Sequence, residues 1–239
     1  MCGRYAIIDG KKVLIAYTAL NKAKLTDKVF QDLPRYNASP MQRLPVFAIR
    51  GEELAAGPMQ WWLIPHWSKD GKPGFSSFNA KAETLDQSKL FAPYFKGSRC
   101  LIPADAFYEW QRVTTTQEVR GTSKSVEEKH PMCIRLKDET PMLLAGLFSV
   151  WKDATGNEHP TFTIITTQPN ELMAPIHNRM PVILPEQHVE QWLDRTYKEI
   201  DQLKKLLAPY PARKMKAHRV SSFVSNPRNE GAECIKEVK

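Results

Sequence analysis

The chain has 239 residues, 42% of them hydrophobic, so it can bury a full core without disulfide or metal staples. Its net charge of +8 favours an anionic partner, nucleic acid above all. The four scattered cysteines form no C-x-x-C pair, and there is no zinc-spaced His cluster, signal peptide or long apolar run. These absences argue against a metal site and a membrane protein, and predict a cytoplasmic one (nucleoid-associated if bacterial).

The first residues are Met1-Cys2-Gly3-Arg4. Aminopeptidases remove an initiator Met that precedes a small residue, and Cys2 would then carry a free α-amine and a thiol on adjacent carbons. Such a 1,2-aminothiol forms an imine with an aldehyde and closes it to a thiazolidine ring. Ordinary pKa values of about 8 for the amine and about 8.5 for the thiol suit this chemistry, and Arg4 is expected to lower the thiol pKa further. Position alone favours an inert Cys2, so the rest of the chain must decide between the two readings.

Apolar spacing predicts an amphipathic helix over residues 11–23, and strands over residues 44–49 and 59–64. Between them, prolines at both ends hold residues 34–40 in extended or turn geometry. Asn37 lies inside that segment. It is either a polar contact for a ligand or a turn residue that satisfies its own backbone.

Three tryptophans, Trp61, Trp62 and Trp67, stand within seven residues, which is more than a strand pattern needs. Trp faces stack on unpaired bases at roughly 1–3 kcal/mol per base, but Trp also fills cores. We expect one or two of the three in the core and at least one at the surface.

Residues 90–95 predict a short helical turn, and residues 99–103 and 106–110 predict strands. Glu109 lies in the middle of the second, aromatic strand. It either faces solvent by alternation or is buried, in which case desolvation raises its pKa and makes it a candidate general acid. The polar residues 113–130 that follow predict a mobile surface loop.

Short apolar segments at residues 132–135, 142–151 and 161–167 complete the predicted sheet, and helices are predicted between residues 185 and 207. His177 lies between two prolines on a rigid loop and is a candidate general acid or base. The elements predict one α+β domain over residues 1–239, with mostly antiparallel strands curled into a barrel-like core and helices outside.

A set of motifs runs in order along nearly the whole chain and resembles the SOS-response-associated peptidase (SRAP) family. These motifs are residues 1–5, 35–40, 62–67, 78–84, 99–103, 107–110, 177–181 and 220–233. Each motif alone is weak, but the ordered set is specific.

The resemblance implies an enzyme that crosslinks covalently to abasic sites in single-stranded DNA and shields the lesion during the DNA damage response. Its N-terminal Cys2 would be the nucleophile and would form a thiazolidine with the ring-opened sugar. Asn79, Glu109 and His177 would be the other catalytic side chains. Glu109 could relay protons, His177 could assist proton transfer or bind near the sugar, and Asn79 could hold the amine or a hydroxyl.

DNA contacts would come from Arg4, Asn37, Lys81 and Arg179, with Trp62 and Trp67 as candidates for a wedge between bases. Lys81 stands where several family members have Arg, so it keeps the charge and loses the bidentate fork. The resemblance implies no metal, no cofactor and a monomer off the membrane.

Two alternatives stay open. One is a thiol peptidase in which Cys2 attacks a peptide bond, its own included, although no Cys-His-Asn protease signature surrounds Cys2. The other is a module that binds single-stranded DNA without a covalent step, which charge and aromatic content alone would support.

Overall fold

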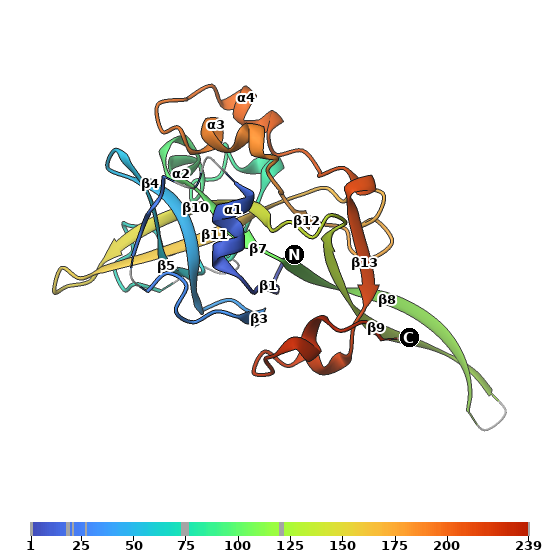
Figure 1. The fold of residues 1–239 in the computed structure, drawn as a ribbon. Coiled ribbons are helices and arrows are strands. Elements are labelled where there is room, and N and C mark those ends of the chain that lie inside the picture. Colours follow the sequence, from blue (N-terminus) through green and yellow to red (C-terminus); the bar gives the residue numbers. More distant parts are fainter. Residues whose placement is uncertain are drawn as a thin grey trace.

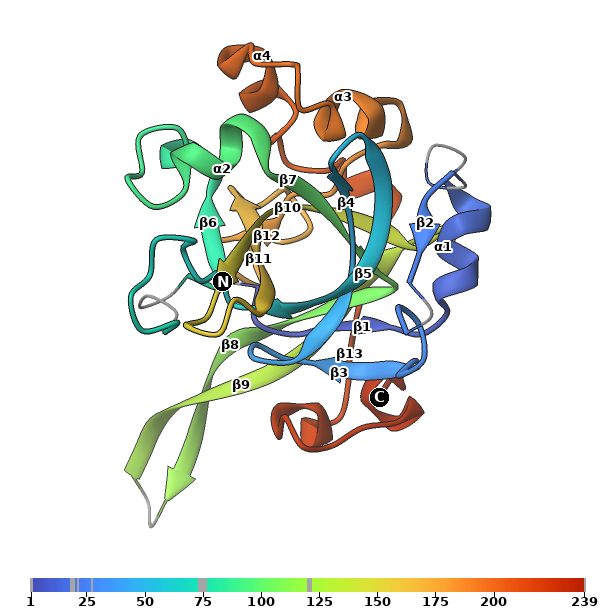
Figure 2. The same ribbon diagram turned by 90° about the vertical axis from the view of Figure 1, so that its left-hand side faces the viewer.

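The computed structural model describes residues 2–17, 20, 22–26, 28–72, 77–119 and 122–238, with the backbone alone at 117–119 and 122–124. Five strands close into a barrel around the main core (Figure 2). In ring order they are β4 (Arg43–Arg50), β5 (Glu53–Trp61), β11 (Glu158–Thr167), β10 (Met142–Lys152) and β7 (Arg99–Ala104). Neighbours pair antiparallel except β5 and β11, which run parallel and complete the ring.

Strand β7 is buried along its whole length, which is why residues 100–104 read as a continuous apolar run. Cys100 and Ile102 point into the inner core, whereas Leu101 belongs to an outer core beneath the helices. Strands β10 and β11 approach so closely at Gly146 that a Cβ there would lie 2.6 Å from the carbonyl oxygen of Thr163. Only glycine fits at that position.

Short helices and strands surround the barrel (Figure 1). Asp9 caps α1 by accepting hydrogen bonds from the backbone N–H of Lys11 at 2.9 Å and of Lys12 at 3.3 Å. The helices are α1 (Gly10–Ala16), η2 (Ala82–Thr84), α2 (Ala92–Gly97), η3 (Glu186–His188), α3 (Val189–Leu193), α4 (Ile200–Lys205), η4 (Ala212–Lys214), η5 (Ser222–Ser225) and η6 (Ala232–Ile235); the small strands are β2 (Lys24–Leu25), β6 (Asn79–Lys81) and β12 (Met180–Pro181). No helix in the described part of the chain is long and apolar enough to cross a bilayer.

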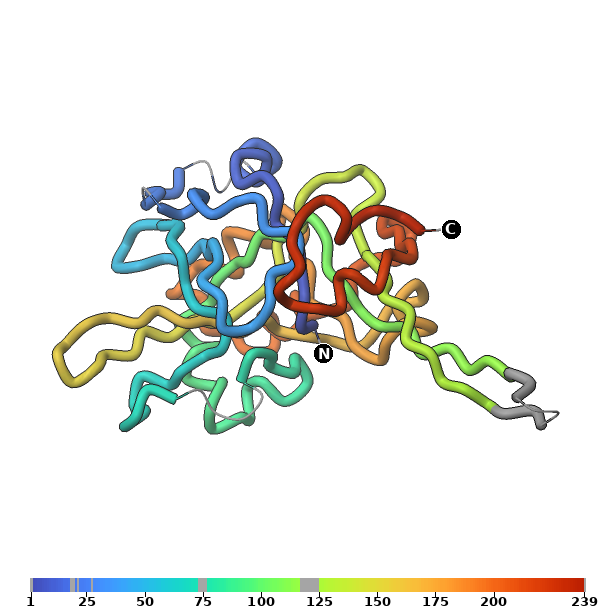
Figure 3. Tube along the Cα trace, turned by 90° about the horizontal axis from the view of Figure 1, so that it is seen from below, coloured from blue at the N-terminus to red at the C-terminus, as the bar shows by residue number. Residues whose placement is uncertain are grey.

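A second sheet lies against the barrel, in the order β13 (Met215–Arg219), β9 (Thr122–Leu136), β8 (Ala106–Val119), β1 (Tyr5–Ile7) and β3 (Arg35–Ala38). The outer halves of β8 and β9 leave the body as a two-stranded ribbon, which we term the arm (Figures 1 and 3). All pairings in this sheet are antiparallel. The predicted α+β class, with a mostly antiparallel barrel and peripheral helices, is therefore confirmed.

The loop predicted over residues 113–130 is wrong as a secondary-structure assignment. The strands stay in register from Val113 opposite Glu128 to Val119 opposite Thr122, and residues 120 and 121 lie outside the described residues. The segment has few apolar side chains because it covers no core. It is rich in β-branched Thr and Val, and its stability comes from backbone pairing and cross-strand contacts.

Candidate active site

Strand β11 brings together two candidate residues that lie far apart in the sequence. On one side it pairs with β6, where Asn79 lies opposite Ile164. On the other it pairs with β12, which directly follows the loop that carries His177. The second sheet supplies Glu109 on β8. It also supplies the N-terminal residues, because Tyr5 pairs with Phe107.

Cys2 is fully buried in the inner core. Burial raises the pKa of its thiol well above the ordinary value, and the nearby charge of Glu109 raises it further. Arg4 does lower this pKa, as expected, but only through its backbone, and burial outweighs the effect. Its guanidinium donates instead to Asn37 Oδ1 at 2.7 Å and the Val224 carbonyl at 2.8 Å. Met1 lies outside the described residues, so its predicted removal stays a prediction.

Glu109 is buried, with only 3% of its surface exposed. Of the two readings of this residue, the buried acid is therefore confirmed. Burial raises the pKa of its carboxyl group to about 8. Near neutral pH the group is largely protonated, which is the state of a general acid.

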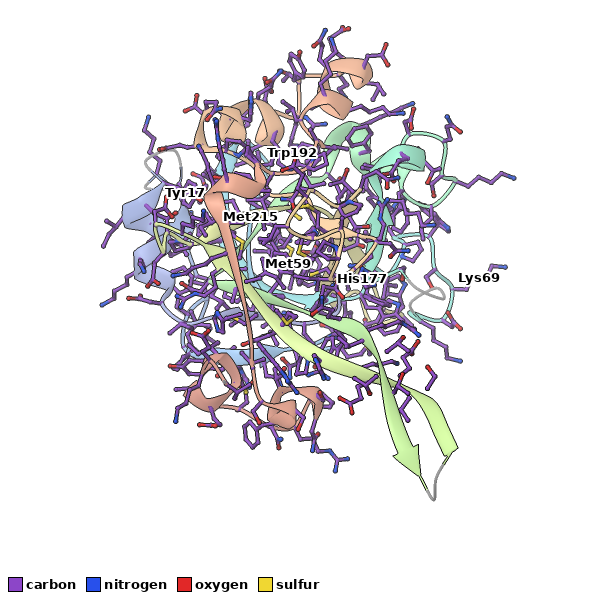
Figure 4. All side chains as sticks on the ribbon, turned by 90° about the vertical axis from the view of Figure 1, so that its right-hand side faces the viewer. Tyr17, Met59, Lys69, His177, Trp192 and Met215 are labelled. Atoms are coloured by element: carbon purple, nitrogen blue, oxygen red, sulfur yellow. The ribbon has the colours of Figure 1, made fainter. Side chains whose placement is uncertain are left out.

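His177 faces Glu109, with 3.8 Å between His177 Nε2 and Glu109 Oε2. Figure 4 shows it at the base of the arm. Its Nδ1 lies 3.1 Å from the backbone nitrogen of Arg179 and 3.2 Å from the Arg179 carbonyl oxygen. The Arg179 backbone therefore offers Nδ1 a donor when the atom is bare and an acceptor when it is protonated. Burial lowers the pKa of His177, so the neutral ring prevails near neutral pH.

Asn79 is buried, and its amide nitrogen donates to the Phe78 carbonyl at 2.8 Å. Its Oδ1 is buried with no hydrogen-bond partner among the described residues. An unsatisfied buried acceptor costs about 1–3 kcal/mol, which a substrate hydroxyl or amine could recover. The prediction that Asn79 serves the reaction is consistent with this geometry but stays untested.

An open pocket of about 380 Å³ lies over the Glu109–His177 pair. Its remaining lining residues are Trp110, Arg112, Lys129 and Ser225. Arg112 and Lys129 lie directly opposite each other on β8 and β9, and Arg112 Nη1 is 2.7 Å from Glu127 Oε1. Sequence reasoning missed both cations, because their proximity depends on a hairpin register in a segment predicted to be a loop.

Two predicted DNA contacts, Asn37 and Arg4, make hydrogen bonds within the protein, and the Arg4 prediction stays untested. Asn37 is fully buried, and its amide donates to the carbonyls of Val224, Asn226 and Asn229 at 2.9–3.1 Å. A direct DNA contact by Asn37 is therefore contradicted, and the turn-residue reading is also wrong because these partners are distant in sequence. Arg4 joins the same network and lies 5.9 Å from the Trp110 ring centre.

The three tryptophans divide as predicted between core and surface. Trp61 is fully buried and stacks on Phe162, with 6.2 Å between the ring centres. Trp67 is 49% exposed and stacks on Tyr94 at 5.8 Å. Trp62 is half-buried against Phe78, so Trp67 offers the more open face for stacking on a base.

The two remaining cations differ in exposure. Lys81 is exposed at the end of β6 and can reach a phosphate. The Arg179 side chain is only 12% exposed, and its guanidinium forms an ion pair with Glu83. In the described part of the chain, no group of three or more His, Cys, Asp or Glu side chains is arranged to hold a metal ion.

The structure thus defines a barrel protein in which a buried Cys at the second position lies near a buried carboxyl group, and that carboxyl group faces an imidazole at 3.8 Å. The chain belongs to the SRAP family, because the family model described as SOS response associated peptidase (SRAP) matches residues 1–227.

Known relatives span nearly the whole chain. "Abasic site processing protein YoqW" of Bacillus subtilis is 38% identical over 235 residues, covering 98% of this chain and 99% of that protein. "Abasic site processing protein HMCES" of Rattus norvegicus is 32% identical over 229 residues, covering 84% of this chain and 64% of that protein. A crystal structure of a Bacteroides thetaiotaomicron protein superimposes over the full length of both chains with a TM-score of 0.81 at 24% identity, which establishes the shared fold.

Proposed function

We propose that this protein processes abasic sites in single-stranded DNA by bonding covalently to them through Cys2, once Met1 has been removed. One observation carries the proposal: Cys2 is buried beside Glu109, and Glu109 lies 3.8 Å from His177. The names of the relatives YoqW and HMCES support the choice of lesion. An abasic deoxyribose in its open form is an aldehyde, the partner that a 1,2-aminothiol requires.

The first step forms a carbon–nitrogen bond. As the sugar ring opens, protonated Glu109 gives a proton to O4′ while the C1′ hydroxyl loses one, leaving an aldehyde and a 4′ hydroxyl. The neutral Cys2 amine attacks C1′. A second proton delivered to the resulting hydroxyl lets it leave as water and yields the imine. The neutral His177 ring, facing Glu109, can return the proton between these transfers.

The second step closes the ring. The Cys2 sulfur bonds to the imine carbon, the thiol proton moves to nitrogen, and the thiazolidine forms with no other leaving group. Because burial raises the pKa of the thiol, the sulfur must lose its proton as it attacks, and the imine nitrogen is the acceptor for that proton. Burial thus protects Cys2 from oxidation and stray electrophiles until an aldehyde reaches it.

The DNA would cross the pocket at the base of the arm. Lys129 and Arg112 offer charge beside the Glu109–His177 pair. Exposed Lys81 and Trp67 would add a phosphate contact and a stacking face. We propose that the protein acts as a monomer in the cytoplasm. Its four cysteines are all free thiols, which suits a reducing compartment.

A peptidase acting through Cys2 is the second candidate, favoured by the descriptive name of the family. Burial and the raised thiol pKa disfavour attack on a substrate peptide. Self-removal of Met1 is the form of this activity that the site could best accommodate, because that bond is adjacent to Cys2.

The test is a crosslinking assay with an abasic single-stranded oligonucleotide, preceded by an intact-mass measurement that shows whether Met1 is present. Wild type should give a complex stable to heat and SDS. Cys2→Ala should lose it yet keep salt-sensitive binding, and Cys133→Ala, which removes another fully buried thiol, should crosslink like wild type. Full crosslinking by Cys2→Ala would refute the mechanism. Peptide cleavage without DNA trapping would establish the peptidase instead.

A further inference from the structure

An ion pair that the proposed reaction does not use ties the segment carrying Asn79 to the segment carrying His177. Arg179 Nη1 and Nη2 lie 2.8 and 2.9 Å from the two carboxylate oxygens of Glu83, in bidentate geometry. Nη2 also donates to the Thr166 carbonyl at 2.6 Å. Glu83 lies in η2, directly after β6, Thr166 lies in β11, and Arg179 directly precedes β12. The Arg179 guanidinium therefore links these three segments.

The backbone of the same arginine holds the His177 ring, through the contacts of 3.1 and 3.2 Å to Nδ1. A single residue, Asn178, separates the two. Because Glu83 and Thr166 fix the Arg179 side chain, they also restrict the position of its backbone. The orientation of Nε2 toward Glu109 therefore depends on contacts made on the far side of Arg179.

We propose that Glu83 and Arg179 are positioning residues for His177: the Glu83 carboxylate fixes Arg179, whose backbone holds the imidazole toward Glu109. The orientation of the His177 ring follows from these contacts alone, whereas its effect on the crosslinking rate rests on the proposed function. Hydrogen-bonded partners of a functional His commonly set its ring orientation and tautomer in this way.

The competing account makes Arg179 a phosphate ligand, as its residue type predicts. Two observations oppose it. The side chain is 12% exposed, and both terminal nitrogens bind within the protein. The two accounts predict different results for removal of Glu83. If Arg179 binds phosphate, its guanidinium would be released and DNA binding would tighten. If Arg179 positions His177, the imidazole would instead become less constrained.

The first experiment needs no DNA. Carbethoxylation of His177 by diethyl pyrocarbonate is followed by peptide mass spectrometry, with His159 as an internal reference. We expect Glu83→Ala and Glu83→Gln to raise the His177 rate relative to wild type, more for Ala, because Gln keeps one acceptor for the guanidinium. Asp86→Asn is the matched control, because Asp86 lies three residues after Glu83 and forms a comparable half-buried ion pair, with Lys204 at 2.9 Å. Weakening that pair should leave the carbethoxylation rate of His177 unchanged.

The second experiment separates rate from affinity. Glu83→Ala should slow crosslinking at saturating DNA on the order of tenfold to a hundredfold with an unchanged Kd, Glu83→Gln should recover part of that loss, and Asp86→Asn should match wild type. Unchanged His177 reactivity in both Glu83 variants would overturn the proposal, as would tighter DNA binding at an unchanged rate. If Glu83→Ala does not fold, Glu83→Gln decides alone. If wild type forms no crosslink, the proposed function fails while the reactivity result still judges the positioning.

Discussion

Strand β8 has two halves that form one continuous strand but differ in the burial of their side chains. From Ala106 to Glu109 it is buried between β1, β9 and the barrel, and from Arg112 outward it is half of the free-standing arm. The inner half changes the chemistry of its side chains, most clearly that of Glu109, because burial removes water. The outer half leaves its side chains in water and contributes charge and reach. The proposed function thus assigns proton transfer and DNA contact to neighbouring parts of one strand.

The largest effect should follow substitution in the inner half. Glu109→Gln removes the proton donor and should slow crosslinking on the order of a hundredfold to ten-thousandfold, with little change in DNA affinity. The same assay across pH should show wild type losing rate as pH rises through about 8, where Glu109 ionises. A Gln variant that crosslinks at the wild-type rate would remove Glu109 from the mechanism.

The stability of the same variant should depend on pH with a definite sign. The folded pKa of Glu109 is raised from 4.5 to about 8, so the native state holds a proton that the unfolded chain has already lost. Wild type therefore loses stability as pH rises from 4.5 through 8, and this loss is complete above 8. Thermal unfolding should show that the stability of Glu109→Gln relative to wild type is higher at pH 9 than at pH 4. A constant difference would mean that the carboxyl group is not buried as described.

How much of this comparison the sequence could provide depends on where each residue's partners lie. The buried half of β8 was predictable, because its aromatic residues and its match to family motifs mark a core strand with a central carboxyl group. The arm was not, since a Thr-rich ribbon pairs through its backbone and has no apolar pattern. Glu83 lies 96 residues before Arg179, so residue type predicted a phosphate ligand where the fold forms an ion pair. Arg4 was likewise expected to act on Cys2, but its side chain turns away.

The two halves should also differ in what they contribute to folding. Phe107 is fully buried in the inner core, and Phe107→Ala should cost about 3–5 kcal/mol of unfolding free energy through lost burial and a residual cavity. Thr114 is exposed on the arm, and Thr114→Ala should stay within about 0.5 kcal/mol. Chemical denaturation of both variants measures the contrast. Comparable losses would mean that the arm folds as part of the core.

The smallest effect, and the sharpest test of the outer half, concerns Lys129. This exposed side chain lines the pocket directly opposite Arg112, whose charge is partly offset by Glu127. If it contacts one phosphate, Lys129→Gln should reduce the slope of log K against log salt by about 0.7, which is the loss of one contact to single-stranded DNA. The crosslinking rate at saturating DNA should not change, because Lys129 is not placed to donate or accept the protons of the reaction. Lys137→Gln removes an exposed lysine just beyond the opposite end of β9 and should leave the slope intact. An equal change in both variants would mean that Lys129 contributes only to the overall positive charge. A change confined to Lys129 would place the DNA strand at the base of the arm, over Glu109 and His177.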